Sequence, residues 1–113
     1  MPVIYHLARR KDWDAAAATG TYAGTADDMR DGFIHFSTAD QVAESAARHR
    51  RGEEDLLLVA VDGDSLGAAL RWEKSRGGAL FPHLYSALPC TAVLWTKPLP
   101  LGDDGLHRFP PLD

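Results

Sequence analysis

Apolar runs along the chain predict several short β-strands. The longest run, Leu56 to Val61, contains no polar residue, which is typical of a central strand covered on both faces. In the first expected strand, residues 2–7, successive side chains point to opposite faces, so Tyr5 and His6 should face different sides. The other expected strands are shorter: 32–37, 70–75, 82–85, 92–96 and 106–109.

Two main helices are expected between these strands. The first spans residues 10–19, because its alanine run favours a helix, and Gly20 suits the left-handed position that ends one. Thr38 and Gln41 have the spacing of a capping box, so Thr38 is expected as the N-cap of a second helix. That helix should run to about Arg50.

The remaining segments are expected to connect these elements. Segment 21–30 is polar and should be irregular. Segment 97–102 contains Pro98 and Pro100, which lack backbone donors, so it should wrap around the fold rather than enter a central strand. No repeat, linker or low-complexity tract divides the chain. The pattern therefore predicts one α+β domain over residues 1–113.

Residues 70–85 concentrate polar and aromatic side chains that an ordinary surface loop rarely combines. As a strand, the first part places Arg71, Glu73 and Ser75 on one face and Trp72 on the other. Trp72 is then expected to pack on the core while the polar face lines a cleft. The alternative interpretation is a hairpin whose polar face is simply solvated, with its charged side chains forming ion pairs around the turn.

Composition narrows the possible function classes. The 113 residues are 45% hydrophobic and 25% charged with a net charge of −4, which argues against nucleic-acid binding through a basic surface. The single cysteine, Cys90, excludes an internal disulfide, fits a reducing cytoplasm and is expected to be a small buried group. No signal peptide and no membrane-length apolar run is present, so we expect a cytoplasmic protein without a membrane partner. The oligomeric state is left open.

Histidines are the first candidates for chemistry. Three of the five lie in expected strands beside aromatic residues: His6, His35 and His83. The other two, His49 and His107, are expected on an exposed helix face and near the tail, and we set them aside. A lone strand histidine is more often structural than catalytic. If the strands are neighbours, however, the three rings and nearby cationic side chains would form a cleft suited to an anionic or nucleotide-like ligand.

Other chemistries find little support in the sequence. No Walker-type loop, Gly-x-Gly-x-x-Gly fingerprint or Gly-x-Ser-x-Gly elbow is present. The histidine spacing does not match a metal-binding motif, so no metal is predicted.

Four motifs together resemble the bacterial family known as domain of unknown function 952. They read Tyr-His-Leu at 5–7, Asp-Gly-Phe-Ile-His-Phe-Ser-Thr at 31–38, Leu-Arg-Trp-Glu at 70–73 and Phe-Pro-His-Leu-Tyr at 81–85. Pro-Leu-Pro-Leu-Gly at 98–102 extends the resemblance over nearly the whole chain. Membership in this family implies no established activity.

The segment 34–38, a following helix and the strand ending at Asp62 are also similar to the core of RNA 2′-phosphotransferases. That resemblance implies an ADP-ribosyltransferase-like fold, a split, mostly antiparallel sheet that grips NAD. It implies that His6 contacts the NAD ribose and that His35 corresponds to the histidine of a His-hydrophobic-Ser segment. The late glutamate that many ADP-ribosyltransferases use is missing, because no glutamate follows Glu73.

These observations lead to one main hypothesis and one alternative. The main hypothesis is a cleft that binds or transforms a small nucleotide ligand, NAD as a substrate or an ADP-ribose-like molecule. The alternative is a noncatalytic metabolite- or protein-binding module that retains the fold. His35 and Glu73 are the candidate catalytic residues. The candidate substrate-binding residues are His6, Ser37, Thr38, Arg71, Ser75, Arg76, His83 and Tyr85.

Overall fold

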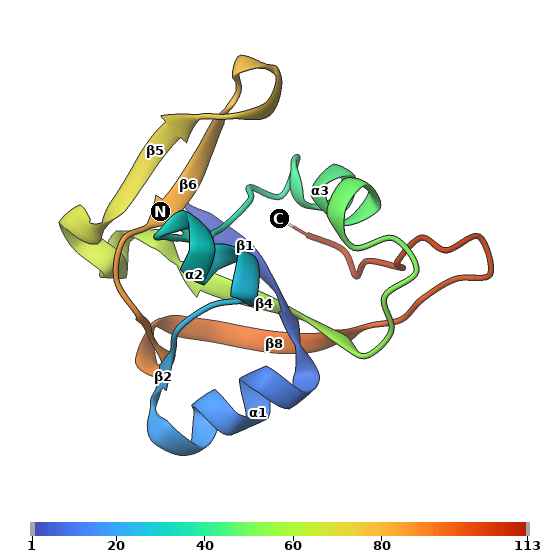
Figure 1. Cartoon of the computed structure of the whole chain (residues 1–113), viewed down its shortest axis with the longest axis horizontal. Coiled ribbons are helices and arrows are strands. Elements are labelled where there is room, and N and C mark those ends of the chain that lie inside the picture. The colour runs from blue at the N-terminus through green and yellow to red at the C-terminus, as the bar shows by residue number, and fades with distance from the viewer. Residues whose placement is uncertain (1, 113) are drawn as a thin grey trace.

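The computed structural model describes residues 2–112 apart from the side chain of Arg76 (Figure 1). One antiparallel sheet has the order β1-β4-β8 and consists of Val3–Arg9, Leu56–Asp62 and Val93–Leu99. β4 lies in the middle, as its unbroken apolar sequence predicts. Its register places Val59 opposite His6 of β1 and Thr96 of β8.

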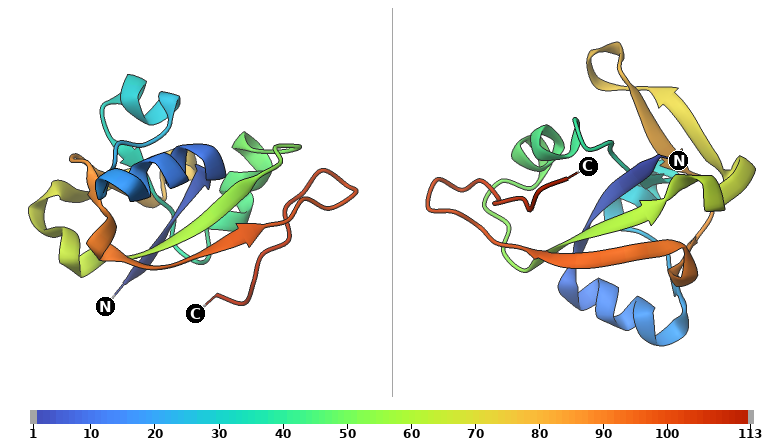
Figure 2. Two further views of the ribbon diagram at one scale, coloured as in Figure 1. Left: turned by 90° about the horizontal axis from the view of Figure 1, so that it is seen from below. Right: turned by 180° about the vertical axis from the view of Figure 1, so that it is seen from behind.

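A second antiparallel sheet has the order β3-β6-β5. Its strands are Ile34–His35, Leu80–Leu84 and Leu70–Lys74. Two further short strands, β2 and β7, pair with each other and span Thr21–Tyr22 and Leu88–Pro89. The β5–β6 hairpin projects from the rest of the molecule (Figures 1 and 2).

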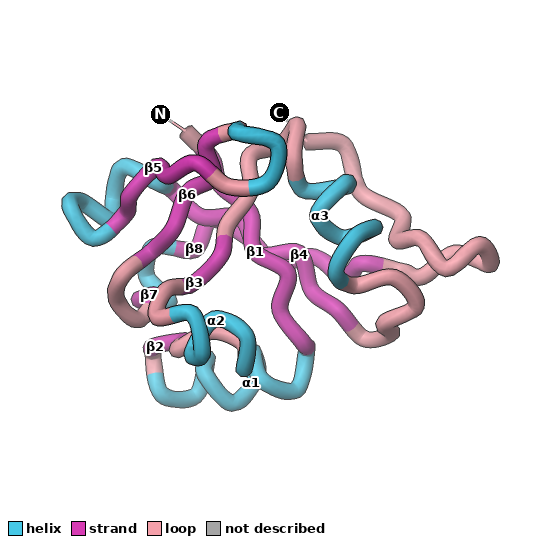
Figure 3. Tube along the Cα trace, turned by 45° about the horizontal axis from the view of Figure 1, so that its top comes forward, coloured by secondary structure: helices cyan, strands magenta, loops and turns pink. Residues whose placement is uncertain are grey.

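Within residues 2–112, a single two-residue bridge joins the two larger sheets. The backbone N–H groups of Tyr5 and Ser37 each donate to the other's carbonyl at 2.8 Å. One residue earlier, just after β3, the Phe36 N–H donates in the other direction to the Pro82 carbonyl of β6 at 3.0 Å. Residues 34–37 therefore change their hydrogen-bonding partner from β6 to β1 within four residues. Beyond this segment the two sheets diverge (Figure 3).

The helices agree with the sequence in part. α1 spans Arg10–Thr19 and ends at Gly20, whose φ of 91° is left-handed, as expected. α3 spans Val42–His49, so it starts later than predicted and Thr38 is not its N-cap. Only half of the expected capping box forms: the Gln41 side chain accepts from the Thr38 N–H at 3.0 Å, while Gln41 itself occupies the cap position.

The prediction that segment 21–30 is irregular is wrong. It contains β2 and the helix α2, Ala26–Asp31. Thr25 caps α2 with a complete capping box: its side chain accepts from the Asp28 N–H, and the Asp28 carboxylate accepts from the Thr25 N–H. This six-residue helix is too short to show an apolar period, so only its cap signals it.

The central strand β4 separates two hydrophobic clusters. Leu57, Val59 and Val61 pack with Trp13 of α1 on one face. The alternate side chains of β4 pack on the other face with Val42 and the rest of the apolar stripe of α3. Figure 2 shows α1 and α3 on opposite sides of this sheet. Burial on both faces explains why β4 carries no polar alternation.

Several local expectations are corrected. Trp72 does not pack on the core, since 41% of its surface is exposed on the projecting hairpin. Segment 97–102 is strand as far as Leu99, which is possible because β8 is an edge strand and tolerates Pro98. Segment 106–109 forms only one bridge, Leu101 with His107, instead of a strand.

Three short 3-10 helices complete the structure: Gly63–Ala69, Arg76–Gly78 and Cys90–Ala92. Cys90 is only partly buried. Within residues 2–112, the helices are all too short or too polar to cross a membrane.

Candidate functional site

A cavity of about 220 Å³ opens where the two sheets diverge. β1 contributes His6, β3 contributes His35 and β6 contributes His83, so residues from three distant parts of the sequence meet there. Ser37 and Ser75 also line it. The three histidines lie on strands of two different sheets, and the two serines lie just beyond the ends of β3 and β5.

His6 is buried and held by two hydrogen bonds. Its Nδ1 lies 2.7 Å from the His35 carbonyl oxygen, which can only accept, so Nδ1 carries the proton. Nε2 then accepts from the Tyr22 hydroxyl at 2.8 Å. Burial lowers the pKa of His6 below 6.5, and the nearby Asp28 carboxylate offsets only part of that effect. The ring is therefore neutral and locked in one tautomer.

Asp28 is the main acceptor of the site. One carboxylate oxygen accepts from the Thr25 N–H at 2.8 Å, and the other lies 3.2 Å from the His35 N and 2.5 Å from His35 Nδ1. Burial alone raises the pKa of Asp28, but the His35 hydrogen bond and the charge interaction with His6 outweigh it and hold this pKa below its ordinary value. Asp28 is thus a buried, ionised carboxylate.

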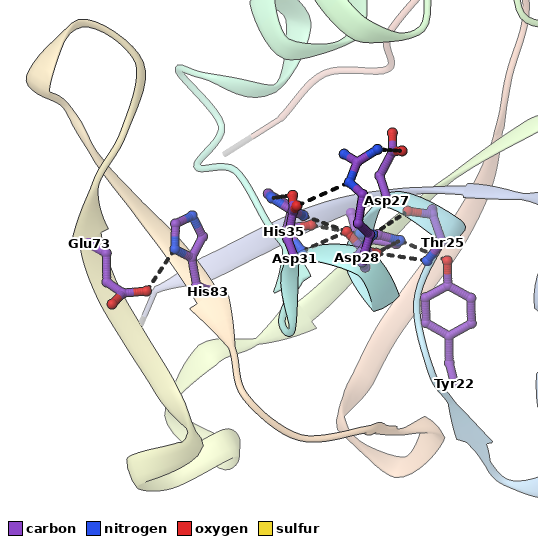
Figure 4. A network of polar contacts seen from close by, with 10 residues as sticks. Tyr22, Thr25, Asp27, Asp28, Asp31, His35, Glu73 and His83 are labelled. Atoms are coloured by element: carbon purple, nitrogen blue, oxygen red, sulfur yellow. Dashed lines mark hydrogen bonds and ion pairs between the residues drawn. The ribbon is translucent and has the colours of Figure 1, made fainter.

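His35 is the accessible member of this network (Figure 4). Its side chain is 43% exposed, and its Nε2 lies 3.2 Å from the Asp31 carboxylate. The Asp28 carboxylate fixes the ring through Nδ1, and Nε2 lies on the side of Asp31, which also lines the cavity. A His–Asp pair with a half-exposed imidazole is an arrangement that can move a proton to or from a bound ligand.

Charges of both signs line the cavity. Asp27, Asp28 and Asp31 lie on the α2 side. Arg50 and His49, at the end of α3, lie on the other side. The Arg50 side chain is only 13% exposed and pairs with Glu53 at 3.2 Å. A ligand with an electron-poor part and an anionic part would match this distribution.

A second polar group lies beside the cavity on the β5–β6 hairpin. The Glu73 carboxylate accepts from the Tyr85 hydroxyl at 2.7 Å and lies 2.8 Å from His83 Nδ1. These two hydrogen bonds lower the pKa of Glu73, and the one from Tyr85 has the larger effect. Phe33 stacks on His83 with ring centres 4.1 Å apart, and the Arg71 guanidinium lies 4.8 Å from the Tyr85 ring centre.

The structure brings together part of the expected site. The cavity lining contains five of the candidates: His6, His35, Ser37, Ser75 and His83. Its described lining does not include four others: Thr38, Arg71, Glu73 and Tyr85. The side chain of Arg76 lies outside the described part of the chain. The predicted catalytic pair His35 and Glu73 is thus divided between the cavity and the hairpin.

Sequence reasoning missed the residues that orient the histidines. Asp28, Thr25 and Tyr22 lie in the segment that was expected to be irregular. The Thr-x-x-Asp spacing at 25–28 was the available signal, because it is typical of a helix N-terminus. Of the two histidines that were set aside, His49 is exposed on α3 as expected but also lines the cavity. His107 is buried, with Nε2 donating to the Glu53 carbonyl at 2.7 Å.

Comparison with known proteins identifies relatives of very similar structure. The crystal structure of protein CC0527 from Caulobacter crescentus is 46% identical, has a TM-score of 0.91, and covers 94% of this chain and 93% of that one. Its solution NMR structure is 47% identical with a TM-score of 0.83, covering 94% and 91%. None of the curated proteins matches the chain. A family model described as protein of unknown function (DUF952) matches residues 7–96, and the chain therefore belongs to this family.

Proposed function

We propose that the protein binds a ribosyl nucleotide of the NAD or ADP-ribose type, with the ribosyl part in the cavity, and cleaves its ribosyl bond. The observation that carries this proposal is the His35–Asp28 pair, whose half-exposed imidazole lines a cavity with charges of both signs. The resemblance of segments 5–7 and 34–38 to RNA 2′-phosphotransferases, and the split arrangement of the two sheets, support the same ligand class.

The size of the cavity limits how much of the ligand it encloses. Pockets that bury a drug-sized ligand measure about 300–1,000 Å³. At about 220 Å³, this cavity suits one ribose and the nicotinamide ring attached to it, but not a whole dinucleotide. The remaining phosphates would lie toward Arg50 at the end of α3, because Arg30, the cationic residue on the α2 side, is paired with Asp27 and Asp31. The aromatic surface of Phe33 and Tyr85 lies beside the opening and could stack on a base.

The charges on the α2 side suit the chemistry of ribosyl cleavage. When the bond between a ribosyl carbon and nicotinamide breaks, positive charge develops on the ribose, and the Asp28 and Asp31 carboxylates would stabilise it. His35 would accept a proton from the attacking water, whose oxygen bonds to the ribosyl carbon while nicotinamide leaves with the bonding electron pair. His6 would act as a positioning residue, because both of its nitrogens are already hydrogen-bonded.

A noncatalytic binding module is the second candidate, and one observation favours it. Glu73, the expected catalytic glutamate, is hydrogen-bonded to Tyr85 and His83 on the hairpin instead of lining the described cavity. The chain would then bind the nucleotide without turning it over.

Binding and turnover can be tested separately. We expect calorimetric titration to detect both NAD and ADP-ribose, and incubation with NAD to release nicotinamide. His35→Gln should retain binding but lower release by about 10²–10⁴-fold. The matched control is Glu44→Gln, which changes an exposed carboxylate on α3 outside the cavity lining and should leave both unchanged. No heat of binding at millimolar ligand would contradict the proposal, and binding without release would favour the noncatalytic module.

A further inference from the structure

The strand β5 has one open edge in the described structure. It is the terminal strand in the order β3-β6-β5, and it lies at the outside of the projecting hairpin (Figure 1). An open strand edge presents backbone donors and acceptors that can pair with another chain. Natural edges are often protected by charge or by proline, so the residues on this edge decide whether it is closed or available.

The hydrogen-bond pattern shows which backbone groups point outward. Tyr85 donates to the Ala69 carbonyl and Ser75 donates to the Ala79 carbonyl, both across the β5–β6 ladder. Inward and outward orientation alternates along an antiparallel ladder, so Arg71 and Glu73 point toward β6. Trp72 and Lys74 therefore direct their N–H and C=O groups away from β6. Pro82, opposite Trp72, agrees with this, because its carbonyl accepts from Phe36 on the other side.

The charges along β5 are complementary to those of a second, antiparallel copy of the same strand. β5 reads Leu-Arg-Trp-Glu-Lys, with opposite charges on either side of Trp72. In an antiparallel pair of two such strands centred on Trp72, Arg71 of each chain lies opposite Glu73 of the other. Cross-strand pairs of opposite charge stabilise a sheet, and like charges destabilise it.

Neighbouring registers lack this complementarity. Inward- and outward-facing backbone groups alternate along the strand. Outward groups of both copies therefore meet only in registers that have one residue, and not a peptide bond, at the centre of the symmetric pair. Centring on Arg71 or Glu73 places two like charges directly opposite each other. Those residues also direct their backbone groups inward, so the central pair would form no hydrogen bonds. Trp72 is thus the centre that satisfies both charge and hydrogen bonding among the three.

We propose that two copies of this chain associate through β5, in an antiparallel pair centred on Trp72. The three-stranded sheet β3-β6-β5 then continues into the same sheet of the second copy. Trp72, which is 41% exposed in the single chain, packs against its counterpart across the symmetry axis. A five-residue edge is small compared with stable interfaces, so the dimer should be weak and should form with rising concentration.

Charge reversal tests this pairing. Arg71→Glu and Glu73→Arg should each place like charges opposite each other at both symmetric positions and weaken self-association by about tenfold. An equal mixture of the two variants should associate again, because every Arg then faces a Glu of the other variant. Sedimentation equilibrium over a concentration series would measure this as a rise above the chain mass of 12.3 kDa.

Two controls keep the test specific. Glu44→Arg and Arg48→Glu reverse an exposed ion pair on α3 and should leave self-association unchanged. Lys74→Pro removes an outward N–H without removing a bond to β6, so it should weaken the dimer while far-UV circular dichroism shows an intact fold. A wild-type chain that stays at 12.3 kDa at every concentration would overturn the proposal, as would a mixture of the reversed variants that fails to associate.

Discussion

Asp28 connects three segments of the chain through its carboxylate. Its oxygens bind the N-terminus of α2 through Thr25 and both the backbone and the ring of His35. His6 in turn donates to the His35 carbonyl and accepts from Tyr22. The orientation of the half-exposed His35 ring therefore depends on the buried groups of Asp28, His6 and Tyr22.

Tyr22→Phe tests the buried end of this network. The change removes the hydroxyl that donates to His6 Nε2 and leaves that nitrogen buried without a donor, which should lower the free energy of unfolding by about 1–3 kcal/mol. Tyr85→Phe is the matched control, because its hydroxyl is exposed and its loss should cost less than about 1 kcal/mol. Urea unfolding measures both, and equal losses would contradict the expectation.

The protonation states predict how stability depends on pH. The pKa of His6 is lowered below 6.5 by burial, so the unfolded chain binds more protons as pH falls through 6.5. The free energy of unfolding should therefore decrease on acidification, and the depressed pKa of Asp28 should add a further loss as pH falls below 3.8. His6→Gln should flatten the first part of this profile in urea unfolding between about pH 8 and pH 5. An unchanged slope would show that His6 does not cause it.

At the scale of elements, local sequence patterns predicted the long strand β4 and the helix α1, which ends at a glycine. β4 and α1 appear where expected, because continuous burial and an alanine run act within a short window. The role of Asp28 could not be read from strand patterns, since its partner His35 lies on another element. Trp72 was misplaced for a related reason: alternation gives its face, but not whether another element covers that face.

Thr25→Ala tests the element that sequence patterns missed. Without the hydroxyl, the Asp28 N–H loses its acceptor and the capping box of α2 opens. The free energy of unfolding should fall by about 0.5–2 kcal/mol. Thr19→Ala, an exposed change near the end of α1, should cost no more than about 0.5 kcal/mol. Urea unfolding compares the two, and a Thr25 effect as small as that of Thr19 would show that the cap contributes little.

At the scale of the whole molecule, stability should be distributed unevenly. β4 is buried on both faces and paired on both edges, whereas the β5–β6 hairpin projects and has one open edge. The cavity lies between these two regions, with His6 on the first sheet and His83 on the second. Motion of the hairpin would therefore change the shape of the cavity without disturbing the main core.

Amide hydrogen exchange measures this distribution. Leu58 and Val59, at the centre of β4, should exchange slowest, because their N–H groups open only when the core unfolds. In dilute protein, Trp72 and Lys74 should exchange fast, because their N–H groups point to the open edge. Their exchange should slow at high concentration if the edge pairs with a second copy. Strong protection of Trp72 in dilute protein would contradict the orientation derived for this edge.

Pro82 interrupts the hydrogen bonding next to the junction between the two larger sheets. Its carbonyl accepts a hydrogen bond from the Phe36 N–H, but proline has no N–H to donate back. The ladder that continues from β3 and β6 therefore lacks one hydrogen bond just before the bridge between Ser37 and Tyr5. Replacing Pro82 with valine would supply the absent hydrogen bond and stiffen that junction. A stiffer junction would restrict how far the two sheets can move apart, and the proline ring thereby influences the width of the cavity between them.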